Sequence, residues 1–62
     1  MYNVAVCDDT EEERLQAAEY AGRFFEREGI EVRIDTYAAG RELLESGREY
    51  DLYLLDVLMP GM

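Results

Sequence analysis

Three aspartates that follow apolar stretches are the side chains best suited to chemistry. Asp8 and Asp9 come directly after residues 2–7 (YNVAVC), and Asp56 closes the stretch that begins at Asp51 (DLYLLD). Three carboxylates held close together repel one another, and a divalent cation is the simplest compensation. The chain has no His and one Cys. Its available ligands are therefore oxygens, which favour Mg²⁺.

A Mg²⁺ ion beside carboxylates is typical of phosphoryl chemistry. A carboxylate can act as the nucleophile and carry the phosphoryl group as an aspartyl phosphate, while the metal neutralises the transferred oxygens. Each aspartate also has a simpler interpretation, because Asp is common in turns and at helix starts. The chemistry therefore depends on whether the fold brings the three side chains together.

The hydrophobic pattern predicts five elements in the order β-α-β-α-β. The predicted strands cover residues 2–7, 30–37 and 51–57, and the predicted helices cover residues 11–28 and 39–46. Thr10 and Glu13 have the spacing of a capping box, in which Thr10 accepts a hydrogen bond from the Glu13 amide. Gly29 and Gly47 are the expected helix stops. One face of the first helix is predicted to be apolar, comprising Leu15, Ala18, Ala21, Gly22 and Phe25, with Phe24 beside them.

The second and third strands differ in pattern. Residues 30–37 alternate between apolar and charged side chains, which indicates an edge strand with one solvated face. Residues 51–57 are nearly all apolar, which predicts a strand buried on both faces. Residues 58–62 contain a Pro and a Gly and are predicted to form a loop.

This order of elements predicts an α/β fold with a parallel sheet and right-handed crossovers. If the third strand pairs with the free side of the first, the strand order is 2-1-3. The carboxyl ends of strands one and three then meet at a topological switch point, where ligands bind in open α/β sheets. Asp8, Asp9 and Asp56 all follow those strand ends.

Composition narrows the possible functions. The chain has 62 residues, 15 acidic and 6 basic, and a net charge of −9, so we expect no nucleic-acid or membrane binding by this segment. At 48% hydrophobic it is too apolar for a disordered acidic tail. No secretory signal pattern opens the chain, and its single Cys fits a reducing, cytoplasmic setting. A single small domain of marginal stability is expected.

The chain resembles the N-terminal half of a two-component response-regulator receiver domain. The resemblance is carried by the first strand with Cys7-Asp8-Asp9, the third strand DLYLLD (residues 51–56) and the loop VLMPGM (residues 57–62). It covers residues 1–62 as a partial receiver, with strands one to three of a flavodoxin-like doubly wound sheet. Cys7 before the acid pair is similar to regulators whose receiver precedes a LytTR-type DNA-binding domain, although a small buried strand residue is the simpler interpretation.

The resemblance implies a role for each matching residue. Asp56 would be the phosphoacceptor and a metal ligand. Asp9 would bind Mg²⁺ directly, Asp8 would act largely through water, and the backbone carbonyl of Leu58 would be a further ligand. The phosphoryl donor would be the phosphohistidine of a sensor histidine kinase. The module would be a signalling domain and not an enzyme, with at most self-catalysed phosphoryl transfer, and any DNA-binding output domain would lie outside it.

The sequence also departs from the family. Receivers have five strands, with a Ser or Thr ending the fourth and a Lys ending the fifth. This chain has no Lys, and its hydroxyl candidates Thr10, Thr36 and Ser46 fall in other elements. We therefore expect a fragment of a longer regulator, with the edge of the third strand exposed. Such an edge predicts a homo-oligomer, or exchange of strands or halves.

Two other functions stay open. A haloacid-dehalogenase-like phosphatase would also use carboxylates after the first strand, but it has the pattern D-x-D, whereas Asp8 and Asp9 are adjacent. An acidic interaction module, in which the aspartates only support turns, needs no phosphoryl chemistry.

Overall fold

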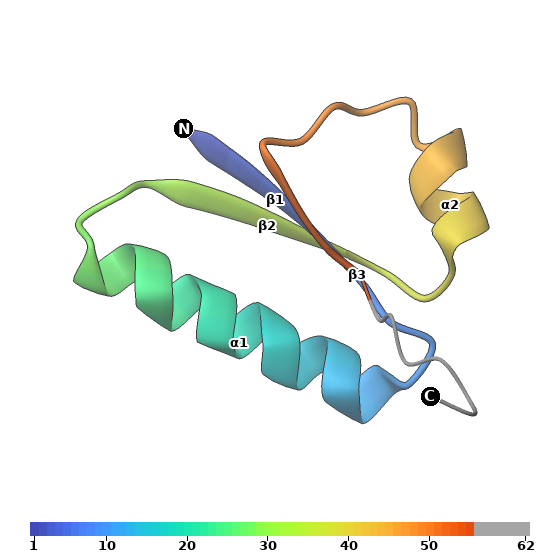
Figure 1. Cartoon of the computed structure of the whole chain (residues 1–62), viewed down its shortest axis with the longest axis horizontal. Helices are drawn as coiled ribbons and strands as arrows, with labels where there is room; N and C mark the ends of the chain where they lie inside the picture. Colours follow the sequence, from blue (N-terminus) through green and yellow to red (C-terminus); the bar gives the residue numbers. More distant parts are fainter. Residues whose placement is uncertain (56–62) are drawn as a thin grey trace.

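Five elements form a small α/β fold in the predicted order. The structure is a computed structural model that describes residues 1–55. The strands are β1 (Tyr2–Cys7), β2 (Val32–Tyr37) and β3 (Leu52–Leu55), and the helices are α1 (Glu11–Arg27) and α2 (Gly40–Glu45). All strand pairs are parallel and the order is β2-β1-β3, as predicted. The long α1 lies on one side of the sheet and the short α2 on the other (Figure 1).

The first strand is the centre of the sheet and of the core. Its register sets Cys7 opposite Tyr37 on β2 and opposite Leu55 on β3. Val4 and Val6 are almost completely buried. Because a central strand is covered by a neighbour on each edge and a helix on each face, a continuous apolar run is stable there.

Two small clusters make up the core, one on each face of the sheet. On the α1 face, Val4 and Val6 pack with Phe25. The Tyr2 ring lies 4.9 Å from the Phe25 ring, measured between centroids. The other face, towards α2, is built from Ala5, Cys7 and Leu43, with Tyr37 and Tyr50 packed against them. Cys7 is thus a small buried core residue.

The predicted helix stops are confirmed at both glycines. Gly29 has φ +72° and Gly47 has φ +68°, a left-handed conformation that residues with a Cβ rarely adopt. The Ile30 amide donates to the Phe25 carbonyl at 2.9 Å, which satisfies a carbonyl of the last helical turn. The chain therefore leaves α1 in the direction that starts β2.

The prediction that the Thr10 side chain caps α1 is wrong. Thr10 has the extended backbone of an N-cap residue, but its hydroxyl makes no capping bond. Its Oγ1 instead donates to Asp9 Oδ1 at 3.4 Å. The three acidic residues still occupy the first turn, as predicted.

Two predictions of burial are also wrong. Leu15 and Phe24 are 56% and 54% exposed, while Ala21 and Phe25 are buried. At 100° per residue Leu15 lies about 80° around the helix from Phe25, outside the narrow stripe that contacts the sheet. The third strand is not buried on both faces, because α1 and α2 lie over β1 and β2. Tyr53 and Leu55 are about half exposed.

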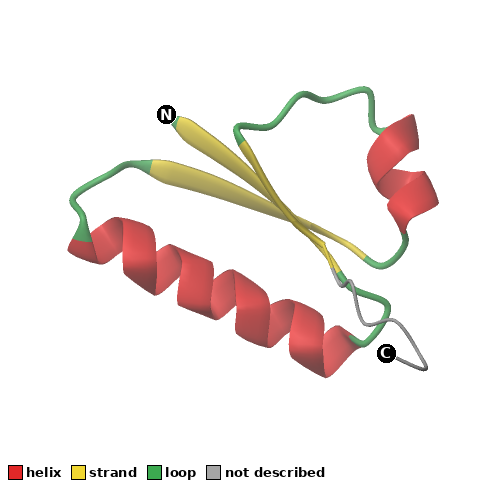
Figure 2. Ribbon diagram, viewed as in Figure 1, coloured by secondary structure: helices red, strands yellow, loops and turns green. Residues whose placement is uncertain are grey.

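The second strand is shorter than expected and begins at Val32, with residues 30 and 31 forming the approach from α1. Its position at an edge of the sheet agrees with the prediction (Figure 2). In residues 1–55 neither helix is long and apolar enough to cross a membrane.

Candidate functional site

The carboxyl edge of the sheet carries the first two predicted site residues. Asp8 and Asp9 follow the last residue of β1 and precede α1. The Asp8 amide donates to the Tyr37 carbonyl at 3.1 Å, which ties the acid pair to the end of β2. Asp8 is half-buried and Asp9 is exposed. The chain therefore presents both carboxylates at the edge predicted for the site.

Short-range hydrogen bonds hold the loop that carries these acids. Asp8 Oδ1 accepts from the Thr10 amide at 2.8 Å, and the Asp8 carbonyl accepts from Arg14 Nη1 at 2.9 Å. The first bond is a turn in which the Asp side chain binds the backbone two residues ahead. This geometry suits a pre-formed ligand site, and it equally suits an aspartate that only supports a turn.

The third strand brings its own carboxyl end to the same place. Leu55 pairs with Cys7, so the described ends of β1 and β3 lie side by side. Asp56 and Leu58, the other two predicted site residues, lie outside the described residues. Within residues 1–55 no group of three or more His, Cys, Asp or Glu side chains is arranged to hold a metal.

The opposite end of the β1–β3 pair is closed by a reciprocal contact. The Asp51 amide donates to the Asn3 carbonyl at 2.7 Å, and Asp51 Oδ2 accepts from the Asn3 amide at 2.8 Å. Asp51 thus completes the ladder just before β3 begins. This contact helps to hold the register that pairs Cys7 with Leu55.

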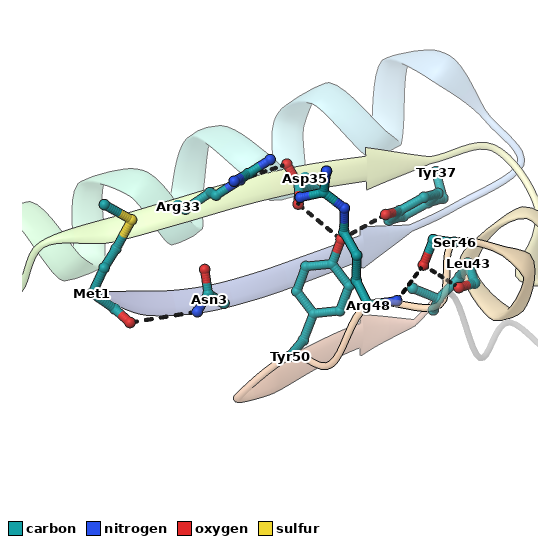
Figure 3. A network of polar contacts seen from close by, with 9 residues as sticks. All are labelled: Met1, Asn3, Arg33, Asp35, Tyr37, Leu43, Ser46, Arg48 and Tyr50. Carbon is teal, nitrogen blue, oxygen red and sulfur yellow. Dashed lines mark hydrogen bonds and ion pairs between the residues drawn. The ribbon is translucent and has the colours of Figure 1, made fainter.

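A second cluster of ionisable groups lies on the α2 face of the sheet (Figure 3). The Tyr50 hydroxyl donates to Asp35 Oδ2 at 2.8 Å, and the Tyr37 and Tyr50 hydroxyl oxygens are 2.5 Å apart. Because the Tyr50 hydroxyl already donates its hydrogen to Asp35, the Tyr37 hydroxyl is the donor in the bond between the two tyrosines. Arg33 Nε lies 3.3 Å from Asp35 Oδ1, and Arg48 Nη1 lies 3.8 Å from Asp35 Oδ2.

These contacts shift the acidity of two side chains. The hydrogen bond from Tyr50, together with the two arginines, holds the pKa of Asp35 below its usual range against a smaller opposing effect of burial. Partial burial, followed by the hydrogen bonds with Tyr37 and Asp35, raises the pKa of Tyr50. The hydrogen bonds of Tyr50 hold the segment between α2 and β3 against β2.

No sequence pattern predicted this cluster. Asp35 and Tyr37 are two residues apart on one strand and so share a face of the sheet, which is a usable signal. Tyr50 lies in an irregular segment, and no periodicity relates it to β2. Only the path of the chain after α2 brings it there.

Comparison with known proteins identified no relative. No protein-family model matches the chain, and neither a curated protein nor a solved structure is significantly similar to it.

Proposed function

We propose that the chain is a phosphoacceptor receiver module of a two-component response regulator, and that its sheet is half of a flavodoxin-like doubly wound fold. The observation that supports this most is the parallel order β2-β1-β3 with Cys7 opposite Leu55. In open α/β sheets ligands bind where the carboxyl ends of neighbouring strands meet, and in the sequence Asp8 and Asp9 follow β1 and Asp56 follows β3.

The donor set fits Mg²⁺. Asp8 and Asp9 would hold the ion, Asp9 directly and Asp8 through water, while Oδ1 of each also accepts a hydrogen bond from Thr10. Asp56 and the Leu58 carbonyl would complete the protein ligands. The ion would neutralise charge on the transferred phosphoryl oxygens.

Asp56 would perform the transfer itself. A carboxylate oxygen would attack the phosphorus of a kinase phosphohistidine, forming the O–P bond as the P–N bond breaks, and the imidazole would keep the electron pair. The partner would thus be a sensor histidine kinase and the location cytoplasmic. Self-association or exchange of strands stays a prediction of this function.

The test is phosphorylation by a small acyl phosphate, followed by intact-protein mass spectrometry. We expect a gain of one phosphoryl group that requires Mg²⁺ and is absent from Asp56→Asn. Asp51→Asn is the matched control, because it changes a carboxylate at the other end of the same strand and should still be labelled.

Metal binding gives an independent measurement. Mn²⁺ should broaden the amide NMR signals of Asp8 and Asp9 in the unphosphorylated protein, and Asp9→Asn should abolish the broadening. Catalytic release of phosphate would indicate the haloacid-dehalogenase-like function instead. If the Asp56→Asn variant were still phosphorylated and Asp9→Asn still showed broadening, the assigned residues would be wrong. If the native chain showed neither phosphorylation nor broadening, the acidic interaction module would be favoured.

A further inference from the structure

Arg14 lies near the start of α1, and its side chain turns back to the end of β1. Arg14 Nη1 donates to the Asp8 carbonyl at 2.9 Å, six positions earlier in the chain. The side chain is half-buried, whereas the three glutamates before it are exposed. None of the ion pairs within residues 1–55 includes it. In a chain with 15 acidic residues, this guanidinium is thus bonded to a neutral carbonyl beside the acid pair.

Three hydrogen bonds join Asp8, Thr10 and Arg14 in a closed ring. The Thr10 amide donates to Asp8 Oδ1 at 2.8 Å, and the Arg14 amide donates to the Thr10 carbonyl at 2.8 Å. The bond from Arg14 Nη1 to the Asp8 carbonyl closes the ring. The Asp8 amide is held separately, by its bond to the Tyr37 carbonyl at 3.1 Å. The Nη1 bond fastens the Asp8 main chain to α1, so Arg14 limits how far the loop of the acid pair can move.

The charge and the hydrogen bond of Arg14 have opposite effects on a cation site. A guanidinium close to a divalent cation repels it and weakens its binding. A bond that holds the ligands in place strengthens binding, since groups that orient ligands typically change metal affinity by about 10–100-fold. The two effects predict opposite signs when Arg14 is replaced, so the sign of the change identifies the role.

We propose that Arg14 is a positioning residue, which holds Asp8 and Asp9 in place for a divalent cation through its bond to the Asp8 carbonyl. This inference rests on the proposed function, which assigns the cation to these two carboxylates. Arg14 acts through Asp8 and is not itself a ligand, because a guanidinium has no acceptor atom.

The test is titration of the full chain with Mn²⁺, followed by electron paramagnetic resonance of the free ion. Arg14→Met keeps a long side chain but loses the charge and the donor, and it should bind Mn²⁺ about tenfold more weakly. Arg14→Lys keeps a charge and a donor, and it should recover most of the affinity because a single bond, and not a bidentate pair, is replaced. Arg23→Met is the matched control, since it removes the same charge from an exposed position of α1 and should not weaken binding.

Hydrogen exchange of the Thr10 amide in the metal-free chain is a second measurement. Because this amide is bonded to Asp8 Oδ1, it should exchange at least about threefold faster in Arg14→Met and at the native rate in Arg23→Met. The Val6 amide, in the buried centre of β1, should keep its native rate and so separates a local effect from a loss of global stability. Arg14→Ala, which has the higher helix propensity, replaces Arg14→Met if that variant does not fold.

The two measurements separate this role from the proposed function. Native Mn²⁺ binding that Arg14→Met does not weaken would overturn the role of Arg14 and leave the proposed function standing. Absence of Mn²⁺ binding by the native chain would overturn the proposed function, and with it the role of Arg14 toward the metal. Unchanged exchange of the Thr10 amide in Arg14→Met would show that the guanidinium does not hold the loop, and would overturn the inference even if the metal binds.

Discussion

At the scale of single residues, Asp35 is a carboxylate with three side-chain partners. It accepts from the Tyr50 hydroxyl and lies beside Arg33 and Arg48, which together keep its pKa low. Asp8 and Asp9 of the proposed phosphoacceptor site differ, since neither is in an ion pair within residues 1–55. The Asp35 cluster holds a loop against the sheet, whereas Asp8 and Asp9 are proposed to bind a metal.

Tyr50→Phe should destabilise the chain in a pH-dependent manner. Asp35 is favoured in its charged form by folding, so its contribution is present above the unfolded pKa of about 3.9 and is lost as pH falls through the lower folded value. Removal of the Tyr50 hydroxyl removes the largest cause of that lowering. The melting temperature of the variant should fall well below that of the native chain at pH 7, with a smaller gap at about pH 3.

Tyr20→Phe is the matched control for this measurement, because Tyr20 is 65% exposed on α1. It should melt like the native chain at every pH. A gap between Tyr50→Phe and native protein that is the same at both pH values would show that Asp35 does not carry the effect.

At the scale of elements, α1 shows how narrow the contact with a three-stranded sheet is. Neighbouring phenylalanines have opposite environments, with Phe25 6% exposed and Phe24 54% exposed. Their rings meet edge to face at 5.2 Å. A turn of 100° per residue is enough to carry one ring into the core and leave the next in solvent.

Phe25→Ala should therefore cost about 3–5 kcal/mol of unfolding free energy, whereas Phe24→Ala should stay within about 0.5 kcal/mol. A domain of this size has about 3–9 kcal/mol in total, so Phe25→Ala should lose a large share of its stability. Urea unfolding followed by circular dichroism compares the two directly. Similar costs for both variants would mean that α1 is rotated relative to the described packing.

At the scale of the whole molecule, charge opposes compaction. The core is confined to two small clusters around β1. Three ion pairs are present in residues 1–55, two of which share Asp35, so most of the 15 acidic side chains gain no compensation from them. Self-repulsion at a net charge of −9 therefore lowers the stability of the folded chain.

Added NaCl should stabilise the protein. Raising it from about 20 mM to about 500 mM shortens the screening length from roughly 20 Å to roughly 4 Å, and we expect about 1 kcal/mol of added stability in urea unfolding. The double variant Glu28→Gln, Glu31→Gln lowers the negative charge at exposed positions and should gain less from salt. A fall in stability with salt would indicate that attraction, and not repulsion, dominates the charge distribution.

The order of elements and most of their boundaries could be predicted because local signals set them. The apolar run of residues 2–7 and the positive-φ glycines at 29 and 47 act within a few residues of chain. The parallel order β2-β1-β3 also followed from pattern, because right-handed crossovers leave few arrangements. Of the candidate site, the positions of Asp8 and Asp9 at the carboxyl edge could be predicted in the same way, whereas Asp56 and Leu58 stay predictions.

The β-α-β-α-β order, the apolar first strand and the helix ends could thus be read from the amino-acid sequence, since each depends on side-chain type and short-range backbone preference. Tertiary packing leaves Leu15 and one face of β3 exposed and brings the Tyr50 hydroxyl to Asp35. These features depend on which surfaces meet across the sheet. Residues distant in sequence share no local signal, so their contacts arise only when the chain packs.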